Sequence, residues 1–189
     1  MRIISGHCKG RKLVPLPGLA IRPTSDRTRE AIFNILGQRV KNTTVLDLFA
    51  GTGALGLEAL SRGAGCATFI DQSCDIIHKN LELCRFTQKA TVICCDIIKD
   101  TLPKSLNGQR FDLVFIDPPY GKGYVDLILQ RESLIDLLDE DCIIVVEQSW
   151  KENLEINLPV LDIYRQKKYS KTNVTFIKKL KQGYGINDR

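Results

Sequence analysis

The sequence predicts an α/β protein built on a mostly parallel, doubly wound sheet with helices on both faces. From residue 44 onward, short apolar runs that are typical of buried strands alternate with segments of helical periodicity. This alternation indicates strands joined by crossover helices. The first apolar run ends in a glycine-rich turn, residues 49–53, and a helical pattern follows at once. A strand, a tight turn and a helix in that order form the ligand-binding unit of doubly wound folds.

Length and composition fit one main domain of a globular protein. The chain has 189 residues, of which 43% are hydrophobic and 26% are charged, and both values are ordinary. The net charge of +5 permits a polyanionic partner but does not demand one. The N-terminus becomes basic too early for a signal peptide, and no apolar run approaches the roughly 20 residues of a membrane span. We expect a cytoplasmic protein with an N-terminal extension at 1–43, a core domain at 44–180 and a tail at 181–189.

The cysteines predict core packing. There are seven, an odd number with no Cys-x-x-Cys pair. Four of them fall in apolar, strand-like runs, so we expect small core residues in a reducing compartment; these are Cys66, Cys94, Cys95 and Cys142. The cysteine spacing and the presence of only two histidines do not match a zinc site. We therefore expect no bound metal.

The first 24 residues are basic and rich in turn residues. Extended pieces at 2–4 and 11–14, broken by Gly6 and Gly10, predict a small hairpin. Ser25 is expected to cap a helix that follows. The apolar stripe of this helix consists of Ala31, Ile32, Ile35 and Leu36. The basic residues leave two interpretations open, a solvated arm or a surface that contacts nucleic-acid phosphates.

Five strand patterns make up the core domain. The first begins at Thr44, and the others lie at 67–71, 91–96, 111–117 and 142–147. Helical patterns follow the glycine turn and occupy 73–85 and part of 124–138. Two further strand patterns, 161–169 and 172–177, have no helix between them. They predict an antiparallel pair at one edge of the sheet.

An acidic residue lies near the carboxyl end of each core strand, namely Asp47, Asp71, Asp96, Asp117 and Glu147. Ligands of doubly wound sheets bind at this edge. A single aspartate after a strand commonly caps a helix, but five in register indicate a binding site. Asp71 follows Gly51 by 20 residues, the spacing from which an acid reaches ribose hydroxyls. Asp96 is placed where the amine of an adenine could donate to it.

The charge of Asp47 bears on the identity of the ligand. This carboxylate lies in the strand just before the glycine turn, where it would repel a pyrophosphate. It suits a ligand with a positive charge, and S-adenosylmethionine carries both an amino group and a sulfonium. The glycine pattern alone, which includes Gly56, would also fit a dinucleotide.

Residues 117–120, Asp-Pro-Pro-Tyr, carry the chemistry. Two prolines hold the backbone extended and remove two N–H donors, which leaves the Asp117 carboxylate and the Pro118 carbonyl as acceptors. Such a pair can hold a planar amine by both hydrogens and favour its attack on an electrophile. Tyr120 offers a face on which a flipped-out base can stack. The motif thus predicts methyl transfer to an amino group of a base.

These motifs resemble a known family. The glycine turn D-L-F-A-G-T-G at 47–53, the acid at 71 and the Asp-Pro-Pro-Tyr motif are similar to class I, Rossmann-like S-adenosylmethionine-dependent methyltransferases that modify amines. The N-terminal blocks R-I-I-S-G at 2–6, K-G-R-K-L at 9–13, R-P-T at 22–24, D-R at 26–27 and R-E-A-I-F-N-I-L at 29–36 resemble the RsmD family. The resemblance covers about residues 1–178. It implies a seven-stranded sheet of order 3-2-1-4-5-7-6 with its last pair antiparallel.

The resemblance also implies the function and the site. The RsmD family methylates N2 of a guanine in 16S ribosomal RNA with S-adenosylmethionine, by direct in-line attack and without a metal. We expect the catalytic residues to be Asp117, Pro118, Pro119 and Tyr120. The cofactor-binding residues are expected to be Asp47, Phe49, Ala50, Gly51, Thr52, Gly53, Asp71, Gln72, Asp96, Ile97 and Asp117. RNA contacts are expected from Arg2, Lys9, Arg11, Lys12, Arg22, Thr24, Arg27 and Arg29.

Two positions depart from the family pattern. Asp71 stands where relatives more often have glutamate, and residues 169–172, Tyr-Ser-Lys-Thr, replace the usual Tyr-Gly of the last hairpin. We expect a monomer whose partner is 16S rRNA, free or within an assembling small subunit. Three alternatives stay open at this point. They are a DNA adenine-N6 or other nucleic-acid amino-methyltransferase, a nicotinamide-dependent oxidoreductase and a non-catalytic RNA-binding module.

Overall fold

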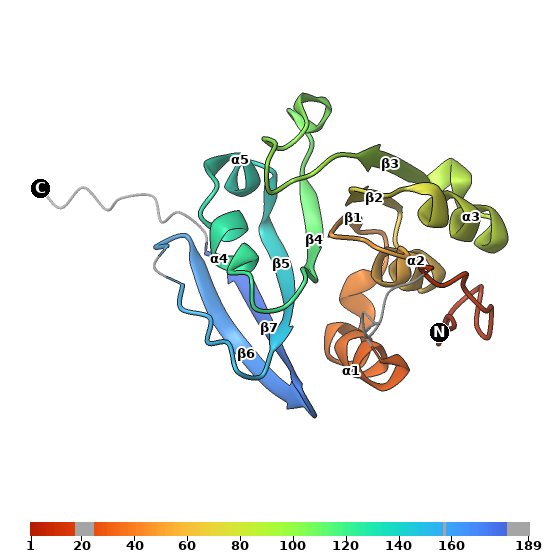
Figure 1. Ribbon diagram of the computed structural model, residues 1–189, viewed down its shortest axis with the longest axis horizontal. Helices are drawn as coiled ribbons and strands as arrows, with labels where there is room; N and C mark the ends of the chain where they lie inside the picture. Colours follow the sequence, from red (N-terminus) through yellow and green to blue (C-terminus); the bar gives the residue numbers. More distant parts are fainter. Residues whose placement is uncertain (18–24, 157, 181–189) are drawn as a thin grey trace, which may run out of the picture.

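Seven strands form one sheet in the order β3-β2-β1-β4-β5-β7-β6 (Figure 1). The computed structural model describes residues 1–17, 25–156 and 158–180. The strands are β1 (Thr44–Leu48), β2 (Cys66–Asp71), β3 (Ala90–Cys94), β4 (Phe111–Ile116), β5 (Leu138–Ser149), β6 (Leu161–Tyr169) and β7 (Thr172–Lys179). Strands β1 to β5 pair in parallel, whereas β7 runs antiparallel to both β5 and β6. The predicted fold class and strand order are confirmed.

Five α-helices lie among the described residues. They are α1 (Asp26–Leu36), α2 (Ala54–Ser61), α3 (Asp75–Cys84), α4 (Tyr124–Leu129) and α5 (Glu132–Ile135). Short 3-10 turns are η1 (Gly37–Val40), η2 (Thr87–Lys89) and η3 (Lys104–Leu106). None of these helices combines the length and apolar character needed to cross a bilayer.

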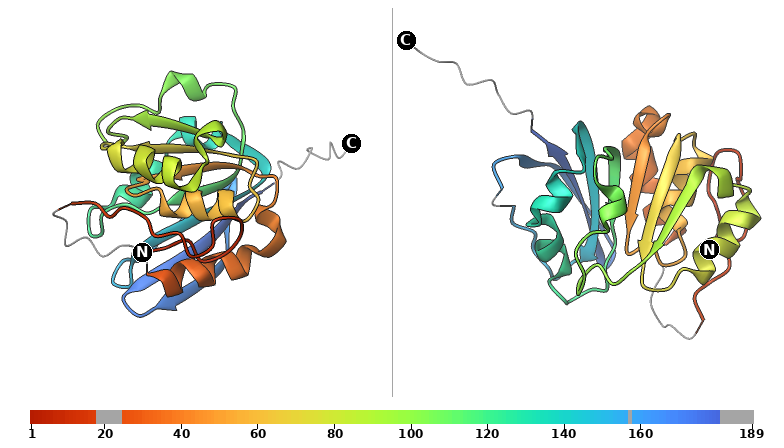
Figure 2. Two further views of the ribbon diagram at one scale, coloured as in Figure 1. Left: turned by 90° about the vertical axis from the view of Figure 1, so that its right-hand side faces the viewer. Right: turned by 90° about the horizontal axis from the view of Figure 1, so that it is seen from above.

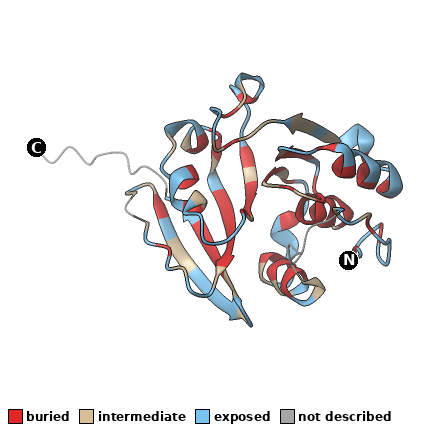
Figure 3. Cartoon of the chain, in the orientation of Figure 1, coloured by how far each residue is buried: buried red, intermediate tan, exposed pale blue. Residues whose placement is uncertain are grey.

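The sheet separates two apolar clusters because successive strand residues point to opposite faces. Leu113 and Phe115 of β4 pack with α1, α2 and α3, whereas Val114 and Ile116 pack with α4 and α5 (Figure 2). The ring of Phe33 in α1 lies 5.7 Å from that of Phe115, measured between centroids. Buried residues therefore line the central strands and α2, while β6 at the sheet edge is largely exposed (Figure 3).

The turn between β1 and α2 depends on glycine. Gly51 and Gly53 have φ values of +56° and +75°, and Gly53 precedes the first turn of α2. Such values favour glycine because it has no Cβ to clash with the backbone. Position 56 requires glycine for a different reason, which is lack of space for a side chain. A Cβ there would overlap the ring of Phe69 on β2 and approach the Asp47 carboxylate to 3.1 Å. The missing side chain lets α2 lie directly against the sheet.

The N-terminal residues form a segment that is fastened to α2 and α3. Arg2 and Lys12 form a single antiparallel bridge, so the predicted hairpin is present as a turn without extended strands. We call residues 1–14 the N-terminal strap; its first residues, red in Figure 2, pass beside α2. Ile3 and Leu13 are buried in the same cluster as α2. The strap is thereby part of the apolar core.

Backbone N–H groups of the strap donate hydrogen bonds to side chains of α2 and α3. The N–H groups of Ile4 and Ser5 donate to the carboxylate of Glu58 at 2.7 and 3.0 Å. The N–H of Val14 donates to Asn80 Oδ1 at 2.7 Å. The cap predicted for α1 is confirmed, since Ser25 Oγ accepts the N–H of Thr28 at 3.0 Å.

Several boundaries differ from the sequence predictions. β3 ends at Cys94 instead of residue 96, and β5 begins at Leu138, inside the segment predicted as helical. β5 also continues past Glu147, which is buried, because β7 pairs with it as far as Ser149. The acid therefore lies within the strand and not at its end.

The expectation for the cysteines is wrong at two positions. Cys66 is exposed, and Cys94 is exposed and forms a disulfide with Cys74. The exposure of Cys94 follows from the place of its strand. β3 is an edge strand and pairs only with β2, so its side chains are covered less than those of a central strand. Cys66 is the first residue of β2, at the end of the strand. Cys142 is buried as expected, and Cys95 is half-buried.

Candidate active site

The glycine turn and the Asp-Pro-Pro-Tyr motif leave the sheet side by side. β1 pairs with β4, and the last pair in that register is Leu48 with Ile116. Residues 49–53 follow directly after β1, and residues 117–120 follow directly after β4. The register therefore brings the two motifs to one place at the carboxyl edge of the sheet, where doubly wound folds bind their ligands.

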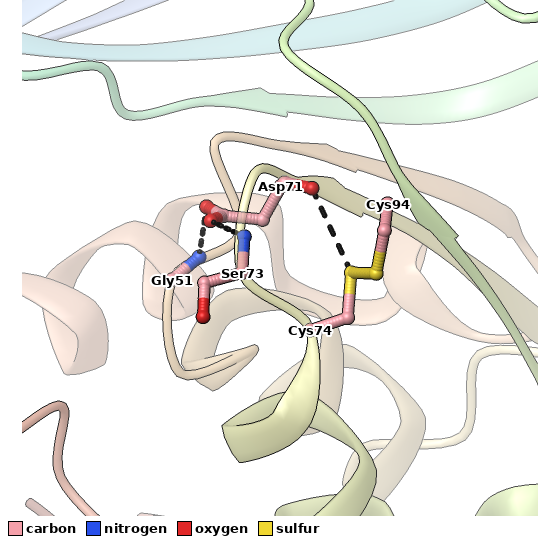
Figure 4. Close-up of a disulfide and its surroundings, with 5 residues drawn as sticks. All are labelled: Gly51, Asp71, Ser73, Cys74 and Cys94. Atoms are coloured by element: carbon pink, nitrogen blue, oxygen red, sulfur yellow. Dashed lines mark hydrogen bonds between the residues drawn. A yellow bond between two sulfur atoms is a disulfide. The ribbon is translucent and has the colours of Figure 1, made fainter.

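Asp71 is fastened to the glycine turn from the other side. Its Oδ2 accepts the N–H of Gly51 at 2.8 Å, and its Oδ1 accepts the N–H of Ser73 at 3.0 Å (Figure 4). The disulfide from Cys74 to Cys94 joins the start of α3 to the end of β3 beside this aspartate (Figure 4). Both carboxylate oxygens are thus oriented by backbone donors, and the surrounding backbone is tied by a covalent bond.

The rest of the glycine turn is also held by hydrogen bonds. The N–H of Ala50 donates to the carbonyl of Ile70 at 3.1 Å, and the amide of Asn80 donates to the carbonyl of Thr52 at 2.9 Å. Phe49 has a φ of +59°, a left-handed conformation that is uncommon for an aromatic residue. A strained residue held by its surroundings is common at ligand sites.

Asp47 lies beneath the turn instead of facing solvent. It is 1% exposed, and its Oδ2 accepts the N–H of Gly56 at 2.8 Å. Burial raises the pKa of this carboxyl well above its usual value. The Gly56 N–H lowers the pKa, while the negative charges of Asp117 and Asp71 raise it further. Asp47 is therefore close enough to Asp71 and Asp117 for their charges to affect its pKa.

Asp96 has a local partner set. Its Oδ1 accepts the N–H groups of Ile98 and Lys99 at 3.1 and 3.3 Å, and its Oδ2 pairs with Lys99 Nζ at 3.1 Å. Its desolvation raises its pKa, but the hydrogen bonds from Lys99 and Ile98 and the charge of Lys99 outweigh this and lower it. The neighbouring Ile97 is 3% exposed, whereas Gln72 is exposed. In this structure Asp96 caps the turn that follows β3.

A pocket of about 330 Å³ adjoins the Asp-Pro-Pro-Tyr motif. Its volume is near the lower limit for small-molecule sites, which suits a single base. Its walls come from residues 118–121 and 123–126, from Gln148 on β5, and from Glu152 and Asn153. Pro118 is buried and Tyr120 is 42% exposed. The Tyr120 hydroxyl lies 3.2 Å from Thr172 Oγ1, which fixes the ring beside the pocket.

Two residues of this region were missed by the sequence analysis. The ring of Tyr124 lies parallel to that of Phe49, with centroids 6.2 Å apart, and so connects the glycine turn to α4. Gln148 lines the pocket from β5. The sequence signal for Tyr124 was the pair Gly121 and Gly123 just before it, which indicates a turn after the Asp-Pro-Pro-Tyr motif. Both glycines have positive φ in the structure. Nothing in the sequence distinguishes Gln148 from other polar residues of a strand.

The basic N-terminal residues divide into exposed and buried ones. Those exposed at the surface are Arg2, Lys9, Arg11, Lys12 and Arg27. Arg22 and Thr24 lie outside the described residues. The prediction for Arg29 is wrong, because its side chain is fully buried. Its guanidinium contacts the Arg2 carbonyl, Asp26 Oδ1 at 3.0 Å and Glu58 Oε2 at 3.7 Å, so it cannot reach a phosphate.

Metal ligands do not gather at this site. Within the described ranges, no group of three or more His, Cys, Asp or Glu side chains could hold a metal ion. The groups that converge at the site are carboxylates, backbone N–H and carbonyl groups, and aromatic rings. They suit an organic cation and a planar base.

The sheet order, the glycine turn and the motif after β4 define a methyltransferase of the class I fold. A solved structure entitled "Putative methyltransferase yhhF from Escherichia coli" has a TM-score of 0.81 at 33% identity, covering 96% of this chain and 99% of that one. A family model described as conserved hypothetical protein 95 matches residues 1–178. The chain belongs to this family, the RsmD family of methyltransferases.

Two curated relatives agree with this assignment. "Putative rRNA methyltransferase YlbH" of Bacillus subtilis is 35% identical over 182 residues, which cover 95% of this chain and 99% of the relative. "Ribosomal RNA small subunit methyltransferase D" of Escherichia coli K12 is 34% identical over 170 residues, which cover 88% of this chain and 84% of the relative. The similarity extends over nearly the whole length of these proteins.

Proposed function

We propose that this protein transfers a methyl group from S-adenosylmethionine to N2 of a guanine in 16S ribosomal RNA. One observation carries the proposal. The register of β1 and β4 brings a glycine turn suited to the cofactor beside an Asp-Pro-Pro-Tyr motif suited to an amine. The names of the relatives, which specify ribosomal RNA and the small subunit, support the choice of substrate.

The cofactor is expected at the glycine turn. Asp71 supplies the carboxylate for the ribose hydroxyls, and its hydrogen bonds to Gly51 and Ser73 hold it in place before the ligand arrives. Asp71 ends β2 and Asp117 follows β4, the two strands that flank β1 and its glycine turn. The negative charges of Asp71 and Asp117 favour a sulfonium and an ammonium group over the pyrophosphate of a dinucleotide. Asp96 and Ile97 are assigned to the adenine, with Gln72 at the edge of the same site.

The Asp-Pro-Pro-Tyr motif holds the base. The Asp117 carboxylate and the Pro118 carbonyl accept the two hydrogens of the guanine amine, which orients its nitrogen and raises its nucleophilicity. Tyr120, fixed by its hydroxyl contact with Thr172, stacks against the ring. S-adenosylmethionine supplies an electrophilic methyl group when it is bound. The amine nitrogen would attack that carbon in line while the bond between the carbon and sulfur breaks, and S-adenosylhomocysteine would leave with the electron pair of that bond. The Asp117 carboxylate stabilises the positive charge that develops on nitrogen, and the amine then loses one proton to water.

The experiment that tests the function measures transfer of a labelled methyl group. Purified protein is incubated with labelled S-adenosylmethionine and 16S rRNA, 23S rRNA or duplex DNA, and the product is mapped by nuclease digestion. We expect N2-methylguanine in 16S rRNA alone. N6-methyladenine in the DNA would replace the proposal with the alternative of a DNA methyltransferase. A parallel reaction on small-subunit particles identifies the assembly stage at which the RNA is a substrate.

We further propose that the protein acts as a monomer. The glycine turn, Asp71 and the Asp-Pro-Pro-Tyr motif lie at the ends of the neighbouring strands β1, β2 and β4 of one sheet, so the site does not need a second copy to assemble. Sedimentation of the protein with and without S-adenosylhomocysteine tests this. A dimer that forms when the ligand binds would contradict it.

A further inference from the structure

An exposed tryptophan lies in a basic surface just beyond β5. Trp150 is the single tryptophan of the chain, and the residue is 43% exposed. Lys168 Nζ lies 4.2 Å from the centroid of its ring, and Lys151 Nζ lies 5.8 Å from it. The N–H of Trp150 donates to the carbonyl of Lys171, in the turn between β6 and β7, at 3.2 Å. We call Trp150, Lys151, Lys168 and Lys171 the Trp150 platform.

Hydrogen bonds connect this platform to the base pocket. Glu152 Oε2 accepts the N–H of Ser149 at 2.9 Å, and its Oε1 accepts the N–H of Gly121 at 3.0 Å. One carboxylate thus fastens the turn that carries Trp150 to the residue after Tyr120. Gln148, Glu152 and Asn153, which flank Trp150 in the sequence, line the pocket itself. The platform therefore has a fixed position beside the pocket.

The chemistry of the platform is that of a site for single-stranded nucleic acid. Such sites combine an aromatic face, on which a base stacks, with cations that contact the phosphates. Lys168 is held over the ring by a cation–π contact at an exposed position, where such contacts are weak. A base that stacks on the ring can displace the ammonium group, which then becomes available to the adjacent phosphate.

The geometry of base flipping gives the platform a purpose. A guanine that enters the pocket must leave its stack, and its neighbour then loses a stacking partner. An aromatic side chain next to the pocket can take the place of that partner.

We propose that Trp150 stacks on a base that flanks the target guanine, while Lys151, Lys168 and Lys171 contact the phosphates of that strand. The inference rests on the proposed function and adds a second binding site for the RNA. It is separate from the basic residues of the N-terminal strap.

The single tryptophan allows a direct measurement. Protein saturated with S-adenosylhomocysteine is titrated with a fragment of 16S rRNA that the wild type methylates. Intrinsic fluorescence reports on Trp150, and the anisotropy of a label on the RNA reports on binding. We expect the emission of Trp150 to be quenched in step with RNA binding. Saturated RNA binding with unchanged emission would overturn the proposal.

Three variants complete the test. Trp150→Ala should weaken RNA binding roughly 5- to 150-fold, the usual effect of losing one stacked base. Trp150→Phe should restore most of the affinity, and affinity for S-adenosylhomocysteine should not change in either. The control is Leu83→Ala on α3, since Leu83 is 40% exposed and distant from the platform in sequence. Equal affinity of Trp150→Ala and wild type would refute the stacking role.

Two further outcomes separate the platform from the proposed function. Suppose that the wild type methylates 16S rRNA, but that RNA does not quench Trp150 and Trp150→Ala binds RNA as the wild type does. The proposed role of the Trp150 platform is then wrong, and the proposed function stands. If the wild type methylates no RNA, the proposed function fails; the titration is then made with unmethylated fragments of 16S rRNA, and Trp150 emission that stays unchanged while they bind overturns the platform as well. Polyglutamate serves as the acidic-protein probe. Quenching by polyglutamate equal to that by RNA would mean a binding surface for acidic protein and would overturn the stacking proposal.

Discussion

Asp71 and Gly51 are 20 residues apart in the chain, yet the Asp71 carboxylate accepts the Gly51 N–H at 2.8 Å. The bond is possible because β1 and β2 are neighbours whose last paired residues are Leu48 and Ile70. It joins the acid expected to bind the ribose to the turn expected to bind the rest of the cofactor. A change at either residue should therefore affect the same ligand.

Asp71→Ala should weaken binding of S-adenosylmethionine by about 1–3 kcal/mol, the range for loss of hydrogen bonds to a charged group. Titration calorimetry with S-adenosylmethionine, S-adenosylhomocysteine and NAD measures the effect. Asp75→Ala is the matched control, because Asp75 is an exposed acid at the start of α3. Tighter binding of NAD than of S-adenosylmethionine by the wild type would be incompatible with the proposed cofactor.

Asp117→Ala should weaken cofactor binding less than Asp71→Ala does and slow methyl transfer by about 10²–10³, as is typical when one transition-state partner is removed. Asp117→Asn keeps an acceptor oxygen and removes the charge, so it should be slowed less. Single-turnover transfer with saturating cofactor isolates the chemical step. A wild-type rate in the alanine variant would remove Asp117 from the mechanism.

Charge removal at Arg11 and Lys12, both exposed on the strap, should lower RNA affinity and reduce its salt dependence. The slope of log affinity against log salt should fall by about one for each phosphate that the variant no longer neutralises. Cofactor binding should be unaffected. The control variant changes Lys89 and Lys104, which are exposed and lie outside the strap. If both double variants bind RNA equally weakly, the effect is one of net charge and the strap has no special role.

Arg29→Ala should destabilise the fold by about 3 kcal/mol or more, because it leaves part of a buried ion network unpaired. The Glu58 carboxylate, fully buried with Arg29, would keep only Arg62 and two strap N–H groups. Arg27→Ala, two residues away and exposed, should change stability by less than about 0.5 kcal/mol. Urea unfolding followed by circular dichroism measures both. Equal stabilities would show that the Arg29 network contributes nothing.

Asp47→Asn should change how stability depends on pH. The raised pKa of Asp47 means that the folded protein holds this proton more tightly than the unfolded chain does. The stabilisation from that proton is present at low pH and is lost as the pH rises from the ordinary value near 3.8 through the raised pKa. An asparagine keeps an acceptor for Gly56 and does not titrate.

The unfolding free energy of Asp47→Asn relative to wild type should therefore increase with pH across that window and then level off. Urea unfolding at a series of pH values measures it, with Asp75→Asn as the exposed control. A constant difference between the two proteins would mean that the pKa of Asp47 is the same folded and unfolded.

Most of the fold could be predicted because its strands carry their own signals. Apolar runs, glycine turns and capping residues are local, and they located β1, β2, β4 and the start of α1. Whether a residue is buried depends on which elements pack against it, and its neighbours in the sequence do not show this. The apolar run that contains Cys94 does not itself show that β3 has a neighbour on one side only; the strand order implied by the family resemblance placed β3 at the edge, but the expectation for Cys94 did not use it. The pocket also needed three dimensions, since Tyr124 and Gln148 come from different elements.

The sequence does contain a signal that Arg29 is buried, although the prediction of an RNA contact considered only its charge. Residues two apart on a helix point in nearly opposite directions, so Arg27 and Arg29 cannot share a surface. Arg29 is in phase with Ile32, Phe33 and Leu36, at spacings of three, four and seven. That phase places it on the apolar side of α1, where a basic side chain needs an acid such as Glu58.

The fastening of the strap has a consequence for the order of events during synthesis. Its partners Glu58, Ser61 and Asn80 follow it by 53 to 66 residues, so the strap has nowhere to dock until α2 and α3 have been synthesised. Contacts of such long sequence separation form slowly. The strap precedes these partners in the chain and can close only after they are made, which leaves the Glu58 carboxylate without its strap donors in every nascent chain that has not yet closed.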